Sequence, residues 1–208
     1  MPRSGSTLQY DEMVQICARR TNCCNLGYWK LHEHRTDRRA AVLPRGCRQL
    51  TTKVHEFDSS LLNVCQRTVV FVTARNLLDI AASAARNGWL SASQTAQSPR
   101  PMARWVTNAA LWHSFGGGQW IRYTDLLGNR TAVVELYRRA LQIGQQGIPD
   151  RLLRPAPYQR DSLHAGKSSA CYPFTREGAR VILSHFYDFH RRVLGTTEPE
   201  KSCFRETQ

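Results

Sequence analysis

The stretch Thr68-Val69-Val70-Phe71-Val72-Thr73 sets apolar and β-branched residues at consecutive positions and runs on into Ala74-Arg75. A strand with one solvated face alternates polar and apolar residues, so an unbroken run predicts a parallel strand buried on both faces. The Ala-rich segment 77–87 follows and ends at Gly88, which predicts a helix with a glycine after its last turn. A strand that leads directly into a helix favours an α/β fold.

The rest of the chain extends this pattern. Further strands are expected at 50–57 and 120–123, helices at 8–17, 102–115, 131–143 and 175–194, and irregular chain at 91–101 and 144–173. This order predicts a single domain, residues 1–208, in which helices flank a central parallel sheet. Ligands of such sheets bind beyond the carboxyl ends of the strands, so residues at those ends are the candidates for function.

The charge balance indicates an anionic partner. The chain has 29 Lys and Arg against 16 Asp and Glu, a formal net charge of +13. Nucleic acid, an anionic membrane face, a multiply charged small ligand or a merely solvated basic surface would each account for it. No helix-turn-helix, zinc-finger or RNA-binding signature is present, so nucleic acid is not the first choice. Without an apolar run of about 20 residues or a signal peptide, the sequence predicts no transmembrane segment and, as written, a cytoplasmic location.

The seven cysteines predict neither a metal site nor disulfides. No Cys-x-x-Cys pair occurs, and an odd count without a secretory signal favours reduced thiols. Cys23 and Cys24 with His32 and His34 lack the usual spacing of zinc ligands, so no metal is expected.

The opening loop, Pro2-Arg3-Ser4-Gly5-Ser6-Thr7, suits an anion. Where such a loop enters a helix, backbone N–H groups converge and the helix dipole adds partial positive charge. A plain helix cap at Ser6 or Thr7 is the alternative. The pattern Gly-x-x-x-x-Gly-Lys-Ser/Thr is not present, so the sequence does not predict ATP hydrolysis.

This loop resembles the 5′-phosphosulfate loop of sulfotransferases that use 3′-phosphoadenosine 5′-phosphosulfate (PAPS) as donor. The resemblance implies the P-loop-like sulfotransferase fold of that family. It also implies that the donor is bound by six consecutive residues, Arg3, Ser4, Gly5, Ser6, Thr7 and Leu8. The family places its first buried strand immediately before this loop, so that strand is expected to be missing here and the chain to be shortened at its N-terminus.

A second match follows the strand at 68–73. Sulfotransferases bind the 3′-phosphate of the donor with an Arg at the end of this strand and a Ser eight positions later. Arg75 and Ser83 are similar in type and spacing, and Asp79 stands at the family's usual Asp position. An Arg at that place offers bidentate donors to a phosphate. The alternative is a surface ion-pairing Arg75 and a Ser83 that only packs in its helix.

The catalytic candidates lie between these two segments, in Thr51-Thr52-Lys53-Val54-His55. The family carries Lys-x-His on the corresponding strand. By that resemblance His55 is the general base, and Lys53 with Arg3 stabilises charge on the departing phosphate oxygen. Residues i and i+2 of a strand share a face, so Lys53 and His55 can reach one cleft. A base at Glu33, His32 or His34 remains open.

Two later segments complete the match. Trp120-Ile121-Arg122-Tyr123 is similar to a family strand whose Tyr lies near the adenine, which makes Tyr123 a nucleotide-contact candidate. A core role for Tyr123 is the alternative. The segment 163–169 stands where the family has a basic loop over the 3′-phosphate, and it makes Lys167 and Ser168 further candidates.

The function that these matches imply is sulfuryl transfer from PAPS to a hydroxyl or amine of a small-molecule or glycan acceptor, with adenosine 3′,5′-bisphosphate (PAP) as product and without a metal. Two alternatives stay open: a basic nucleic-acid-binding protein, and an inactive nucleotide-binding relic of the sulfotransferase fold. The sequence predicts neither the acceptor nor the oligomeric state.

Overall fold

Helices account for most of the regular structure. The computed structural model describes residues 5–29, 45–63, 67–115, 118–153, 171–195 and 203–204. The main helices are α1 (Ser6–Ala18), α3 (Leu77–Arg86), α4 (Ala92–Gln97), α5 (Arg100–Phe115), α6 (Tyr123–Gly128), α7 (Arg130–Leu141), α9 (Arg176–His185) and α10 (Tyr187–Phe189). The described residues also form short 3₁₀ helices, η1 (Ser59–Asn63), η2 (Gln145–Gly147) and η3 (Asp150–Leu153), and a short π-helix, η4 (His190–Leu194). None of the helices described is long and apolar enough to cross a membrane.

The strands of the described residues are short and pair in twos, all parallel. Strand β1 (Cys23–Trp29) pairs with β2 (Gln49–Val54), β3 (Phe71–Ala74) with β4 (Gln119–Arg122), and β5 (Cys171–Tyr172) with β6 (Cys203–Phe204). Within the described ranges no ladder joins these pairs into one sheet. The predicted central parallel sheet flanked by helices, and with it the P-loop-like sulfotransferase fold, is therefore wrong for this structure.

The failure of that prediction has a physical cause. The apolar run does have two buried faces: Val72 and Trp120 pack in one core with α3, α5 and α9, while Phe71 and Ile121 pack in a second core with α1, α6 and α7. Side-chain pattern reports the faces of a strand, whereas joining a sheet depends on hydrogen bonds along its edges. Helices cover both faces of β3 and β4, and among the described residues the strand edges hydrogen-bond only in pairs.

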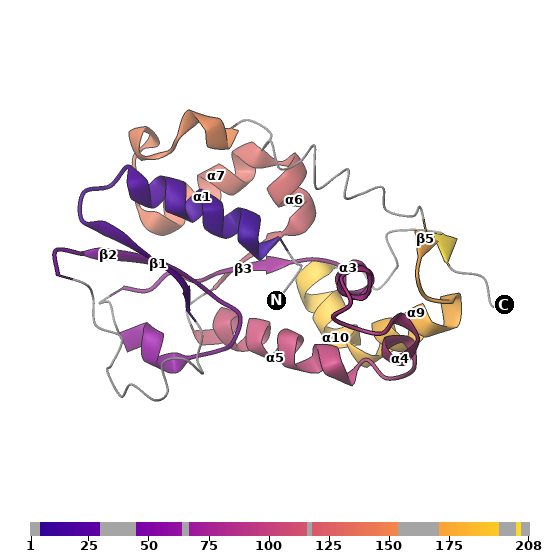
Figure 1. Cartoon of the computed structure of the whole chain (residues 1–208). Coiled ribbons are helices and arrows are strands. Elements are labelled where there is room, and N and C mark those ends of the chain that lie inside the picture. Colours follow the sequence, from indigo (N-terminus) through magenta and orange to yellow (C-terminus); the bar gives the residue numbers. More distant parts are fainter. Residues whose placement is uncertain are drawn as a thin grey trace.

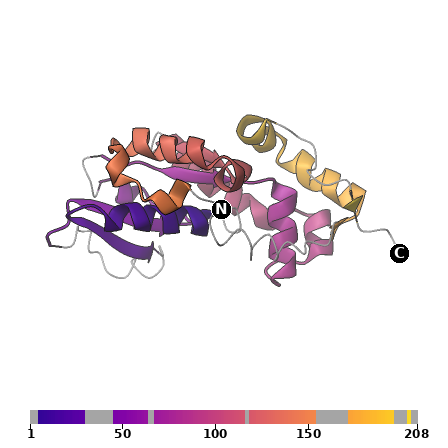
Figure 2. The same cartoon turned by 90° about the horizontal axis from the view of Figure 1, so that it is seen from above.

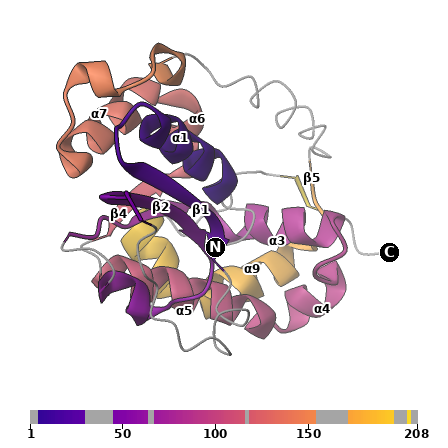
Figure 3. The same cartoon turned by 60° about the vertical axis from the view of Figure 1, so that its left-hand side comes forward.

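The two cores lie on opposite sides of the strand pairs. In Figures 1 and 3, α1, α6 and α7 lie on one side of the strands and α5 lies on the other, with α3, α4 and α9 beyond the end of β3. Figure 2 shows α1 lying along the β1–β2 pair, with α3 and α4 at the other end of the molecule. α1 contacts β1, β2 and β3, so one helix spans the β1–β2 and β3–β4 pairs.

A buried ion pair fixes α1 against α7. Arg130 Nη1 lies 2.5 Å from Glu12 Oε1, and Tyr137 donates a 2.7 Å hydrogen bond to Glu12 Oε2. Glu12 is 1% exposed and Arg130 6%, and the guanidinium also donates to the carbonyls of Leu126 and Leu152. Burial raises the pKa of Glu12, and the charge of Arg130 offsets part of that rise. Every partner in this cluster is needed to satisfy the others.

Replacement of Glu12 by Gln should therefore destabilise the fold. It leaves the buried Arg130 without its counter-charge, which costs about 3 kcal/mol in the free energy of unfolding measured with denaturant. Glu135→Gln is the matched control, because Glu135 also pairs with arginines, Arg138 and Arg139, but at the surface. That variant should keep its midpoint nearly unchanged. Equal midpoints for the two variants would show that the buried pair contributes nothing.

Among the described residues, three disulfides correct the prediction of reduced thiols. Cys17 pairs with Cys23, Cys24 with Cys47, and Cys171 with Cys203. The adjacent cysteines thus hold the start of β1 both to the end of α1 and to the chain that enters β2. Sequence spacing gave no sign of this, because the pairing depends on which chain segments meet in space.

These pairings can be counted by alkylation. In the unfolded but unreduced protein we expect a thiol reagent to label a single cysteine, Cys65, which lies outside the described residues. After reduction it should label all seven. Peptide mass spectrometry identifies the labelled positions, and labelling of all seven without reduction would contradict the three pairs.

Candidate functional site

The candidate site forms around the first turn of α1. Gly5 precedes this helix with φ +95°, a conformation that glycine adopts without strain. A Cβ added there would lie 2.5 Å from Tyr123 Cδ2, so the backbone at Gly5 passes directly against the Tyr123 ring. Gly5 is the N-cap residue, so no N-cap side chain accepts a hydrogen bond from the first turn of α1. The first turn therefore presents backbone N–H groups of the kind that bind anions.

Two strands fix the position of this turn. Thr73 of β3 donates a buried 2.6 Å hydrogen bond to Gln9 Oε1, and Lys53 of β2 donates a 2.6 Å hydrogen bond to Thr7 Oγ1. The ammonium of Lys53 is thereby held beside the N-terminal end of α1. The described part of the predicted anion-binding loop, residues 5–7, therefore lies beside the predicted catalytic Lys53.

Arg75 joins the same place through strand register. Ala74 of β3 is paired with Arg122 of β4, so Arg75 and Tyr123 leave the two strands side by side. The guanidinium carbon of Arg75 lies 4.3 Å from the centroid of the Tyr123 ring, and Arg75 Nε lies 3.8 Å from Asp79 Oδ2. Tyr123 therefore contacts both Gly5 and Arg75.

The chain around Arg75 is rigidly held. Asn76 is fully buried and caps α3 by accepting a hydrogen bond from the Leu78 amide, and His190 Nε2 accepts one from the Leu77 amide. Since His190 is also fully buried, the C-terminal helices fix the start of α3. Arg75 thus projects from a junction with little freedom, which suits a residue that orients a phosphate.

Lys53 is half-buried, and this burial changes the pKa of its side chain. Burial lowers the pKa of its ammonium, and the carboxylate of Asp11, one turn beyond Thr7 on α1, partly restores it. An opposite charge near a half-buried lysine favours the charged form. Asp11 had not been singled out from the sequence, although its i+4 spacing from Thr7 on a helix is a usable signal.

His55 lies just beyond the end of β2. Its ring makes a T-shaped contact with Tyr28 of β1, with ring centroids 5.2 Å apart. Burial, reinforced by nearby positive charge that includes Lys53, lowers the pKa of His55 to about 3. The imidazole is therefore neutral near pH 7, the form that can accept a proton, although a low pKa also makes it a weaker base. Tyr28 was missed because β1 was not predicted.

Other predicted residues are not brought together by the described structure. The Leu8 side chain packs against the core of α1, α6 and α7, so only its backbone can face an anion. Ser83 is 6% exposed two turns along α3, and its role beside Arg75 stays a prediction. Several candidates lie outside the described residues: Arg3, Ser4, Lys167, Ser168, His32, Glu33 and His34.

A cavity of about 220 Å³ lies next to this site without forming it. It opens between β2 and residues 67–71, beneath the α1 residues Gln9, Tyr10 and Met13. Ser6 and Lys53 line it, but Arg75, Tyr123 and His55 do not. The cavity thus marks the gap between two strand pairs, and we place the candidate site at the strand ends, where the charged groups converge.

Comparison with known proteins adds no relative. The chain matches no family model, no curated protein and no solved structure.

The close approach at Gly5 gives a direct test of the site. Gly5→Ala should lower the free energy of unfolding by about 1–2 kcal/mol, because alanine pays for positive φ, and by more through the clash with Tyr123. Gly88→Ala is the matched control: Gly88 has φ +70° and nothing within 4 Å of an added Cβ. Denaturant unfolding should show the larger loss for Gly5→Ala. A larger loss for Gly88→Ala would contradict the contact between the loop and Tyr123.

Proposed function

We propose that this protein transfers the sulfuryl group of PAPS to a hydroxyl or amine acceptor. The observation that carries the proposal is the convergence of three segments that are distant in sequence. The turn at Gly5, the strand end at Arg75 and the strand end at Tyr123 meet at one point, with Lys53 beside them. Each of these segments is assigned to the donor from its sequence, and their proximity supports that assignment.

The chemistry of these groups fits a donor with two separate phosphate-type anions. The open N-terminal turn of α1, with Lys53 hydrogen-bonded to Thr7, suits the 5′-phosphosulfate. Arg75, held at the end of β3, suits the 3′-phosphate through a bidentate contact. Tyr123, which contacts both sides, suits the adenosine between them. Two anion sites for one ligand would also use part of the +13 charge.

The proposed reaction is an in-line displacement at sulfur. His55 accepts the proton of the acceptor hydroxyl or amine while the new bond to sulfur forms. Lys53 stabilises the negative charge that collects on the phosphate oxygen as its bond to sulfur breaks, and PAP leaves. Catalysis here consists of positioning and electrostatics, as in phosphoryl transfer.

Calorimetric titration with PAP tests the donor site. The wild type should bind PAP more tightly than ATP, and Arg75→Ala should weaken binding at least tenfold, since a charge-assisted hydrogen-bonded contact contributes about 1.5–3 kcal/mol. Arg75→Lys should recover part of the loss, because it keeps the charge without the bidentate geometry.

Arg86→Ala is the matched control for charge. Arg86 lies exposed in the last turn of α3, and its loss changes the net charge by the same amount. It should leave PAP affinity nearly unchanged. Equal weakening by Arg75→Ala and Arg86→Ala would indicate non-specific attraction, and no binding by the folded wild type would reject the proposal.

A further inference from the structure

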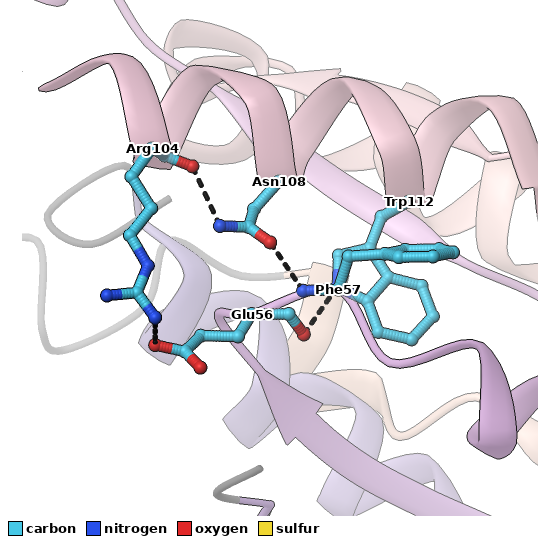
Figure 4. Close-up of polar contacts among 5 residues, drawn as sticks. All are labelled: Glu56, Phe57, Arg104, Asn108 and Trp112. Atoms are coloured by element: carbon cyan, nitrogen blue, oxygen red, sulfur yellow. Dashed lines mark hydrogen bonds and ion pairs between the residues drawn. The ribbon is translucent and has the colours of Figure 1, made fainter. Parts of the chain in front are cut away.

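The chain just after His55 is held by α5 through its backbone. Asn108 Oδ1 accepts a 2.6 Å hydrogen bond from the Phe57 amide, and Trp112 Nε1 donates a 3.1 Å hydrogen bond to the Glu56 carbonyl (Figure 4). These two bonds satisfy consecutive backbone groups from two side chains one helical turn apart. A segment that has left its strand would otherwise have to find water or another partner for those groups.

The Asn108 amide has only one orientation that fits this arrangement. Its Nδ2 donates a 2.8 Å hydrogen bond to the carbonyl of Arg104, one turn earlier in α5, so its oxygen is the atom left to face Phe57 (Figure 4). Arg104 itself forms an ion pair with Glu56, with Nη2 2.6 Å from Oε1. Asn108 is thus a fixed acceptor rather than a side chain free to rotate.

Side-chain contacts also hold residues 56–58 in place. The Phe57 ring lies 5.0 Å from the rings of both Trp112 and Phe115, and Trp29 at the end of β1 donates a 3.0 Å hydrogen bond to Asp58. Residues 56–58 are therefore tied to α5 and β1 at once. β2, which ends at Val54, fixes the chain before His55.

His55 is the one residue between these two fixed pieces of backbone. Within the described residues, no hydrogen bond reaches its buried Nδ1 atom. Catalytic bases are commonly oriented by a third group that bonds the ring. Here the ring of His55 is oriented by its contact with Tyr28 and by the position of its own backbone.

We propose that Asn108 is a positioning residue for His55: by accepting the Phe57 amide hydrogen bond, it fixes the backbone that holds the imidazole against Tyr28 and beside Lys53. This inference rests on the proposed function for its catalytic meaning. Asn108 lies 51 residues from Phe57 in sequence, so no local pattern could have indicated it.

The test replaces the acceptor and then restores it. Asn108→Leu keeps about the same size and raises the helix propensity, but it removes the acceptor oxygen, whereas Asn108→Asp keeps an oxygen for the Phe57 amide. The His55 ring signal is followed by NMR through a pH titration of the full chain, and it is assigned by its loss in His55→Gln. In wild type the ring should stay neutral down to about pH 3. In Asn108→Asp its midpoint should stay below that of Asn108→Leu, although the added carboxylate raises it above the wild-type value. In Asn108→Leu its midpoint should move towards the ordinary value near 6.5, because a released ring gains solvent.

Calorimetry with PAP separates this inference from the proposed function. All three proteins should bind PAP equally, since Asn108 lies outside the donor site. An unchanged His55 titration in Asn108→Leu would overturn the positioning role, and so would an Asn108→Asp midpoint that is not below that of Asn108→Leu. Failure of the folded wild type to bind PAP would remove the catalytic meaning. If Asn108→Leu does not fold, Trp112→Phe takes its place: it loses the bond to the Glu56 carbonyl and should shift His55 in the same direction.

Discussion

The rest of the site depends on the close packing of the chain at Gly5 against the Tyr123 ring. The contact requires a residue without a side chain, because the backbone has positive φ and an added Cβ would overlap the ring. It joins the start of α1 to the start of α6, directly after β4, and through Tyr123 to Arg75, directly after β3. Thr73 and Lys53 then fix the same turn from β3 and β2. One helix terminus is therefore set by three strands that belong to two separate pairs.

Groups other than Lys53 and Arg75 stabilise this arrangement. The Glu12–Arg130 pair with Tyr137 is buried and anchors α1 against α7, and the disulfides of Cys17 and Cys24 hold the end of α1 and the start of β1. Under the proposed function, Lys53 and Arg75 are the groups that contact the ligand. A helix fixed by its buried side can leave its first turn open, which is what preorganised anion binding requires.

The sequence predicted the individual elements well and their assembly poorly. Helices near α1, α3, α5 and α7 and the strand at β3 follow from apolar periodicity and from glycine stops, which are local signals. β1 was missed because Cys23 to Trp29 shows no clean alternation of polar and apolar residues. The disulfides and the separate strand pairs depend on which distant segments come together and on hydrogen bonds along strand edges, and no local sequence pattern encodes either. At the site, Gly5, Lys53, Arg75 and Tyr123 came from motifs, whereas Asn108 and Tyr28 needed the fold.

The structure of the protein with PAP bound would test the central claim most directly. The account predicts one phosphate at the N-terminal turn of α1 within reach of Lys53, the other on the Arg75 guanidinium, and the adenosine against Tyr123. A bisphosphate bound instead in the cavity between β2 and residues 67–71, away from Arg75 and Tyr123, would contradict it.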